Sequence, residues 1–225
     1  MNFDFLTDPF FLNLLVQGLF TTLGLAFAAV LLGSVLALFL AIVRMSKNRF
    51  FIFLATAYVE IIRGTPIVVQ LIIVYAVFNL PVILVGNQDV SLFIPGIITL
   101  FINSSAYVSE VVRAGVEAVD KGQTEAGRSL GLSGAETFRK IVLPQAVKNI
   151  LPALGNEFVT LIKETSVLSF LGVAELTYQG KMIQSATYSI LEVYLVIAVF
   201  YFLLTFPTSK LMAKFERRLK KADGK

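Results

Sequence analysis

Charged side chains stand inside long apolar stretches of this sequence, where a charge costs about 2.5–3.5 kcal/mol near the centre of a membrane. Two acid–arginine couples, Glu60 with Arg63 and Glu110 with Arg113, have the i, i+3 spacing that places side chains together on one helix. We expect each couple to form an ion pair. Such pairs would hold helices together or close a gate.

Two polar stripes also follow helical spacing in these apolar stretches. The first consists of Asn103, Tyr107 and Glu110, and the second of Asn156, Thr160 and Glu164. Each stripe is expected to line one helix face, and counting about 1.5 Å per residue places Asn103 and Thr160 near mid-depth. A meeting of two such stripes suits a binding site for a small polar solute. Hydrogen bonding between the helices is an equally good interpretation of the same residues.

Lys163 adjoins the second stripe but projects about 100° away from Glu164 on a helix. It has two candidate roles, pairing with Glu157 or Glu192, or approaching a carboxylate of the solute. If the two i, i+3 couples neutralise themselves, Glu157, Lys163 and Glu164 remain, with a surplus of one negative charge. A low-dielectric site with surplus negative charge favours a cation. We therefore expect the Glu164 carboxylate to face the cationic group of the solute.

The composition excludes several classes of protein. The chain has 225 residues, of which 56% are hydrophobic, and its mean hydropathy is +0.80. It has no cysteine and no histidine, so the usual thiolate and imidazole metal sites are absent. It has no P-loop motif for binding ATP. We expect a membrane protein without a metal or cofactor of its own, and no nucleic-acid partner, because its basic residues flank apolar stretches.

Five apolar stretches are long enough to cross a bilayer as helices, and we expect an all-α membrane protein. They are residues 13–43, 50–80, 92–119, 150–171 and 190–212. The expected organisation is an interfacial segment 1–12, a transmembrane domain 13–212 with a cytoplasmic loop 120–146, and a basic cytoplasmic tail 213–225.

Orientation follows from lysine and arginine, which concentrate after the first and third stretches and in the tail. The positive-inside rule makes these segments cytoplasmic, with the N-terminus outside and the C-terminus inside. Within the second stretch, Pro66 is expected to kink the helix near Arg63. Residues 81–91 and 172–189 are expected to be loops.

The charged loop before the fourth stretch is expected to hold two short helices. The first covers Glu125 to Leu130 and stops at Gly131, which supplies a positive φ. The second opens with a capping box in which Ser133 and Glu136 bond reciprocally. Pro144 is expected to kink or end that second helix.

This loop resembles the EAA loop of ABC importer permeases, whose pattern is E-A-A, three residues, G, nine residues, I-x-L-P. Here it reads Glu125-Ala126-Gly127, three residues, Gly131, nine residues, and residues 141–144 (IVLP), with Gly127 as the one departure. Further stretches resemble the polar amino-acid branch, the histidine/glutamine type: residues 60–66 (EIIRGTP), Gln70, 106–113 (AYVSEVVR), 121–123 (KGQ), 143–146 (LPQA) and 161–166 (LIKETS).

The resemblance implies a type I ABC importer transmembrane domain and a transport subunit rather than an enzyme. Its coupling helix would dock on a cytoplasmic ATPase through Glu125, Ala126, Gly127, Arg128 and Gly131. The implied partners are two ATPase subunits that bind ATP and Mg, a second permease chain, most simply in a homodimer, and an extracytoplasmic solute-binding protein. The implied location is the cell (inner) membrane, in contact with its lipid.

The resemblance makes the solute an amino acid, and the surplus negative charge favours a basic one such as arginine, lysine or histidine over glutamine. The alternative is an ion-coupled secondary transporter or channel built on Glu60, Glu110 and Glu164. The EAA pattern favours the importer, because a secondary carrier has no ATPase to dock.

Overall fold

The computed structural model describes residues 3–86 and 88–222 and is mostly helical. The nine α-helices of this part are α1 (Pro9–Arg44), α2 (Arg49–Gly64), α3 (Ile67–Phe78), α4 (Phe93–Glu117), α5 (Lys121–Ser129), α6 (Gly134–Thr137), α7 (Leu143–Glu164), α8 (Leu176–Thr187) and α9 (Ile190–Ala222). Shorter elements are the 3₁₀ turns η1 (Asp4–Thr7), η2 (Val90–Leu92) and η4 (Thr165–Phe170), and the π turn η3 (Phe138–Val142). Strands β1 (Leu84–Val85) and β2 (Gln88–Asp89) form a small antiparallel hairpin in which Leu84 lies opposite Asp89.

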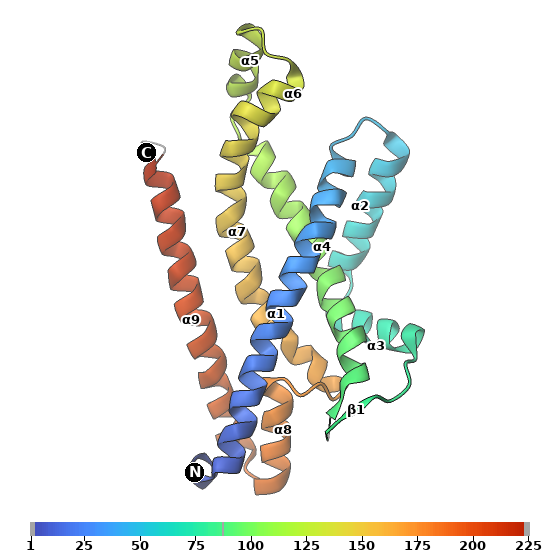
Figure 1. Cartoon of the computed structure of the whole chain (residues 1–225), viewed down its shortest axis with the longest axis vertical. Helices are drawn as coiled ribbons and strands as arrows, with labels where there is room; N and C mark the ends of the chain where they lie inside the picture. Colours follow the sequence, from blue (N-terminus) through green and yellow to red (C-terminus); the bar gives the residue numbers. More distant parts are fainter. Residues whose placement is uncertain (1–2, 87, 223–225) are drawn as a thin grey trace.

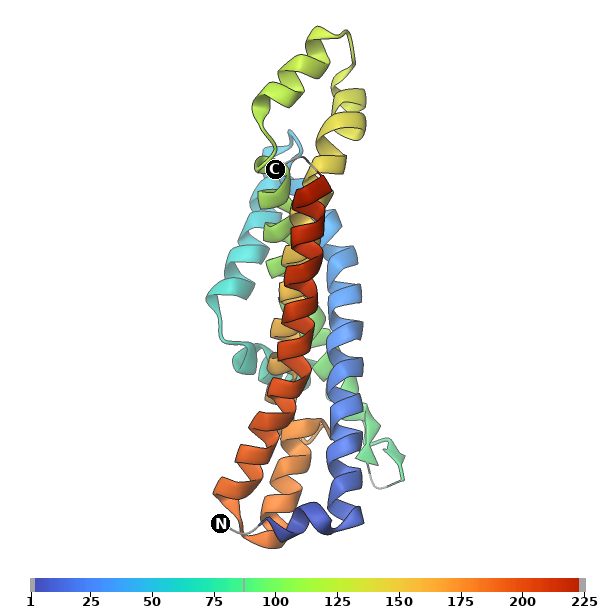
Figure 2. The same cartoon turned by 90° about the vertical axis from the view of Figure 1, so that its left-hand side faces the viewer.

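Four long helices, α1, α4, α7 and α9, run along the length of the molecule (Figure 1). Helix α4 lies at the centre and packs against α1, α2, α3 and α7. Helices α5 and α6 project at one end, whereas the N-terminus and α8 lie at the other (Figure 2). The long helices therefore place the α5–α6 loop and helix α8 at opposite ends of the molecule.

Close packing between α1 and α4 depends on small residues at helical spacing. Ala26, Ala29 and Ala37 of α1 are completely buried, and Gly33 lies in the same row. A Cβ added at Gly33 would lie 2.9 Å from the Cβ of Ser104 on α4, closer than real side chains approach. Small residues thus let the two helix backbones approach each other, as is common in membrane bundles.

Three helical segments are long and apolar enough to cross a membrane, among the residues described: Pro9–Arg44, Val90–Glu117 and Ile190–Leu219. Helices α2 and α3 meet this criterion only as a pair, bent by 111°. The expected disturbance at Pro66 is confirmed in its place, but the helix is broken there rather than only kinked. Pro66 lacks an N–H, and its ring holds Thr65 in an extended conformation with φ −118° and ψ 145°.

Residues 172–189 were expected to form a loop, but they contain helix α8. Its N-terminus is capped by the buried carboxylate of Glu175, which accepts from the backbone N–H groups of Thr177 at 2.9 Å and Tyr178 at 2.7 Å. The hydroxyl of Tyr201 on α9 donates to the same carboxylate at 2.9 Å. The polar sequence of this segment did not predict a helix, because contacts with α9 help to hold α8 in place.

The expected helix end at Pro144 is also wrong. Elements α6, η3 and α7 follow one another without a gap from Gly134 to Glu164. Pro144 lies in the first turn of α7, where a missing N–H is tolerated. The turn before it is a π turn, in which the N–H of Leu143 donates to the carbonyl oxygen of Phe138, five residues earlier. This wider turn joins α6 to α7 without a gap.

The long helices extend past the expected spans at both ends of the chain. Helix α1 begins at Pro9, after the short turn η1, so it takes in part of the expected segment 1–12. At the other end, α9 continues without a break to Ala222 and takes in most of the expected tail.

Candidate functional site: the α5–α6 loop and the intramembrane polar residues

Local hydrogen bonds fix the shape of the α5–α6 loop. Helix α5 ends in a Schellman motif around Gly131, whose φ is +82°. In this motif the N–H of Leu132 donates to the carbonyl of Gly127 at 3.2 Å, and that of Gly131 donates to the carbonyl of Arg128 at 3.1 Å. The Arg128 guanidinium also donates to the carbonyl of Leu132 at 2.9 Å. The sequence correctly predicted that Gly131 stops this helix.

The predicted capping box at the start of α6 is also confirmed. The hydroxyl of Ser133 accepts from the N–H of Glu136 at 3.2 Å, and the Glu136 carboxylate accepts from the N–H of Ser133 at 3.0 Å. Lys140 lies 3.2 Å from the same carboxylate. The bonds from Ser133, backbone first, and the Lys140 charge lower the pKa of Glu136 to about 2.

Gly127 faces the interior of this loop rather than its outer surface. A Cβ there would lie 2.7 Å from Cγ2 of Thr137 and 2.8 Å from Cδ1 of Ile141, so a side chain at this position would force these two side chains to shift. The outer surface of α5 carries Glu125, Ala126 and Arg128, all exposed, and ends in Leu130, whose side chain is 81% exposed.

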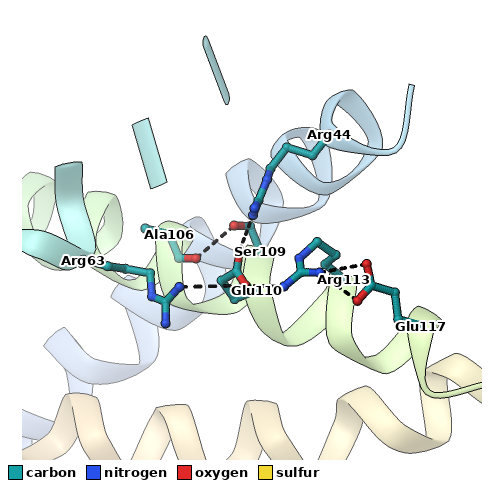
Figure 3. A network of polar contacts seen from close by, with 7 residues as sticks. All are labelled: Arg44, Arg63, Ala106, Ser109, Glu110, Arg113 and Glu117. Carbon is teal, nitrogen blue, oxygen red and sulfur yellow. Dashed lines mark hydrogen bonds and ion pairs between the residues drawn. The ribbon is translucent and has the colours of Figure 1, made fainter. Parts of the chain in front are cut away.

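Glu110 is the centre of an ion-pair network between three helices (Figure 3). Its carboxylate pairs with Arg44 at the end of α1, with Arg113 at 2.8 Å on its own helix, and with Arg63 of α2 at 3.8 Å. Arg113 also pairs with Glu117 at 2.7 Å. The predicted Glu110–Arg113 pair is confirmed, but the carboxylate also joins α1 and α2 to α4.

The predicted Glu60–Arg63 pair is wrong. Arg63 turns toward Glu110, and its guanidinium carbon lies 5.5 Å from the centre of the Tyr107 ring, in a cation–π contact. Glu60 is exposed and has no ion pair in the described part of the chain. Arg63 favours α4 because there it meets both a carboxylate and an aromatic face.

Asn103 and Gln70 form a buried contact between α4 and α3. The Asn103 side-chain nitrogen donates to the Gln70 side-chain oxygen at 3.2 Å, and the two residues are 3% and 7% exposed. The oxygen of the Asn103 side chain is buried and has no hydrogen-bond partner within the described residues. Such an oxygen is available to a donor from a bound solute.

The second predicted stripe is spread along α7. Asn156 lines a cavity of about 480 Å³ between α4, α7 and α9, together with Lys148 and Asn149. Thr160 and Glu164 lie further along the helix and are partly buried, while Lys163 is exposed. The Glu164 carboxylate interacts electrostatically with Lys163 and with Glu157, which sits beside Ser104 of α4. Asn103 and Tyr107 are not among the residues that line the cavity beside Asn156.

Comparison with known families decides the class of this protein. Residues 29–221 match the family described as "Binding-protein-dependent transport system inner membrane component". The chain belongs to this family. It is therefore a multi-pass inner-membrane component of an ABC transporter, as the EAA pattern predicted.

Similar permeases cover almost the whole chain. The arginine transport system permease protein ArtQ of Bacillus subtilis is 37% identical, over 99% of this chain and 100% of its own length. The glutamine transport system permease protein GlnP of Escherichia coli is 37% identical, over 98% and 99%. The nopaline transport system permease protein NocM of Agrobacterium fabrum is 42% identical, over 85% and 82%.

Two solved ABC transporter structures have the same fold as this chain. A crystal structure of an amino acid ABC transporter with histidines has a TM-score of 0.88 and 45% identity, covering 97% of this chain and 100% of that one. An inward-facing methionine ABC transporter, MetNI, has a TM-score of 0.76 at 18% identity, which shows the fold alone. The fold is thus the type I importer permease fold.

Sequence reasoning missed three residues of these sites. Arg44 was read only as a topology signal at the end of the first stretch, although it is the closest partner of Glu110. Gln70 appeared only within a motif, although its position four residues after Pro66 suggests a bond back to the preceding helix. Leu130 is predicted only as the last residue of the first loop helix, although its side chain is 81% exposed.

Proposed function

We propose that this chain is the transmembrane subunit of an ATP-driven importer of amino acids. The observation that carries the proposal is the α5–α6 loop, which combines the EAA spacing with a helix start and stop fixed by its own hydrogen bonds. A second support is that the similar permeases above are named for arginine, glutamine and nopaline transport.

The proposed topology has five crossings: α1, the broken pair α2–α3, α4, α7 and α9. The 45–48 connection, the α5–α6 loop and the C-terminal end of α9 lie toward one end of the molecule (Figure 2). Lysine and arginine concentrate in these segments, counting Arg44 and Arg49 at the two ends of the 45–48 connection, so we assign that end to the cytoplasm. The N-terminus, the hairpin and α8 then lie outside.

The proposed complex contains two permease chains, as a homodimer, and two ATPase subunits that bind ATP and Mg. An extracytoplasmic binding protein delivers the amino acid. Helix α5 docks on the ATPase through Glu125, Ala126, Arg128 and Leu130, while Gly127 and Gly131 set its angle to the second helix. ATP binding draws the two ATPases and their coupling helices together and opens the bundle outward; hydrolysis returns it to the inward-facing state.

The proposed substrate site lies between α4 and α7. Asn103 and Tyr107 contribute from α4, and Thr160 and Glu164 from α7, with Asn156 further along the pathway. The Glu110 network, with Arg44, Arg63 and Arg113, serves as a structural clamp or gate beside it. In α7, Glu157 and Glu164 lie near each other with Lys163 as a neighbouring cation, and this local surplus of one negative charge supports a basic amino acid.

The substrate assignment is tested by direct binding. Purified complex should bind arginine more tightly than glutamine, and Glu164→Gln should weaken arginine binding about tenfold or more, because a charge-assisted bond is lost. Glutamine binding is the matched control and should change little. Unchanged arginine binding in the variant would remove Glu164 from the site.

The transport class is tested by co-purification with the neighbouring ATPase and by its stimulation. Amino acids presented with their binding protein should stimulate ATP hydrolysis by the complex. Stimulation by none of them, together with sodium- or proton-driven uptake by this chain alone, would favour the ion-coupled carrier instead.

A further inference from the structure

The break between α2 and α3 leaves backbone carbonyls without their helical donors. The carbonyl of Ile62 would accept from the nitrogen of residue 66, but Pro66 has no N–H. The side-chain nitrogen of Gln70 replaces it, at 2.7 Å from the Ile62 oxygen. This nitrogen also lies 3.1 Å from the carbonyl oxygen of Thr65 and 2.9 Å from its hydroxyl, which itself donates to the carbonyl of Ile61.

These acceptors fix which way the Gln70 amide points. Two carbonyl oxygens, and a hydroxyl whose proton is already donated elsewhere, can only accept, so the group among them must be the NH₂. The Gln70 oxygen is therefore turned toward α4, where it accepts from the side-chain nitrogen of Asn103 at 3.2 Å. Burial of both residues keeps water from competing for these bonds.

Asn103 consequently keeps its nitrogen toward Gln70 and leaves its oxygen open. That oxygen is buried and without a donor in the described part of the chain. An open acceptor of this kind is costly unless a ligand or an ordered water completes it. The orientation that creates it is set not by Asn103 itself but by the broken helix, through Gln70.

We propose that Gln70 is a positioning residue, which couples the break in the second span to the orientation of the Asn103 amide. Asn103 then offers an acceptor to an N–H group of the substrate, such as an ammonium or a guanidinium. The proposal rests on the proposed function, because it takes Asn103 as a substrate contact. Gln70 touches no substrate. A rotation of α3 about residues 65–66 would withdraw Gln70 and free the Asn103 amide to turn.

A double-mutant cycle on the purified permease–ATPase complex tests this role, with the Kd for arginine as the readout. Gln70→Met keeps the length of the side chain and removes both its donor and its acceptor. In the native background it should raise the Kd about tenfold or more. In an Asn103→Ala background it should change the Kd by less than about twofold, because a residue that acts only through Asn103 has nothing left to position.

Thr65→Val is the matched control at the break. It removes the hydroxyl beside Gln70 and leaves the Ile62 and Asn103 bonds in place, so the Kd should stay close to the native value. If Gln70→Met fails to assemble, Gln70→Glu takes its place in the cycle. A carboxyl can also change the arginine Kd through its charge, so the readout is the difference between backgrounds: Gln70→Glu should change the Kd by a larger factor in the native background than with Asn103→Ala.

Two outcomes overturn the proposal, and they differ in meaning. Equal losses in the two backgrounds, or no loss in either, would show that Gln70 does not act through Asn103. A native complex that binds no amino acid, with or without its binding protein, would overturn the proposed function and this role with it.

Discussion

Removal of the Glu110 carboxylate should destabilise the bundle, whereas the same change at Glu117 should not. Glu110 is the acceptor for arginines from α1, α2 and α4, and its side chain is 19% exposed. Glu110→Gln leaves Arg44 and Arg63 without a carboxylate partner in the described part of the chain, while Arg113 keeps Glu117. Glu117 lies two turns further along the same helix, is 62% exposed, and among the described residues pairs with Arg113 alone. Glu117→Gln is therefore a matched control.

The magnitude follows from burial. Removal of one partner from a buried ion pair costs about 3–5 kcal/mol. The Arg44 side chain is 10% exposed, close to that limit, but Arg113 and Arg63 are 35% and 38% exposed and must be discounted for solvent screening. Glutamine also keeps one acceptor. We expect a loss of about 2–3 kcal/mol in the free energy of unfolding for Glu110→Gln, and less than about 1 kcal/mol for Glu117→Gln.

For a chain of this length, about 1 kcal/mol shifts the Tm by roughly 2–4 °C. Glu110→Gln should therefore lower the Tm by about 4–12 °C, and Glu117→Gln by less than about 4 °C. The assay heats detergent-purified complex in steps and measures the fraction that stays monodisperse on size exclusion. Equal shifts for the two variants, or no shift for Glu110→Gln, would refute the view that Glu110 holds three helices together.

Three further predictions concern the α5–α6 loop. Gly127→Ala places a Cβ 2.7 Å from Thr137, so it should lower the free energy of unfolding by about 1–3 kcal/mol and reduce amino-acid-stimulated ATPase activity. Gly134→Ala is the control and should be neutral, because a Cβ there has no atom within 4 Å. Equal activity in both variants would contradict this prediction. Gly131→Val forces a β-branched residue to φ +82°, at roughly 1–2 kcal/mol, and should weaken ATPase association in pull-down assays, whereas Gly131→Asn should retain it. The pKa of Glu136 is depressed to about 2, so its capping contribution is complete above the unfolded pKa and is lost as pH falls toward 2. The protection of α6 amides, corrected for the intrinsic exchange rate at each pH, should therefore fall over that range, and Glu136→Gln should abolish this pH dependence.

Sequence reasoning succeeded where the structure depends on neighbours in the chain. The stop at Gly131 and the capping box of Ser133 with Glu136 each involve residues within one or two helical turns, so their spacing is enough to predict them. The Glu110–Arg113 pair is local in the same sense. The membrane class followed from composition, because long apolar stretches have few other uses.

Sequence reasoning failed where the interaction partner of a residue comes from a distant part of the chain. Arg44 lies 66 positions before Glu110, and Arg63 turned away from its neighbour Glu60 because α4 offered both a carboxylate and an aromatic ring. Helix α8 was not predicted because its N-cap residue, Glu175, is held in place by a hydrogen bond from Tyr201 of α9, which lies far along the chain. The full break at Pro66 involves Gln70, whose side-chain nitrogen donates to the backbone carbonyls that the break leaves without helical donors.

The most direct test of the central claim is amino-acid uptake by proteoliposomes that contain this chain, its ATPase and its binding protein. The account predicts arginine uptake that requires the binding protein and ATP on the side of the ATPase, and that stops when the ATPase is omitted. Uptake of arginine by the permease chain alone, driven by a sodium or proton gradient and indifferent to ATP, would contradict it.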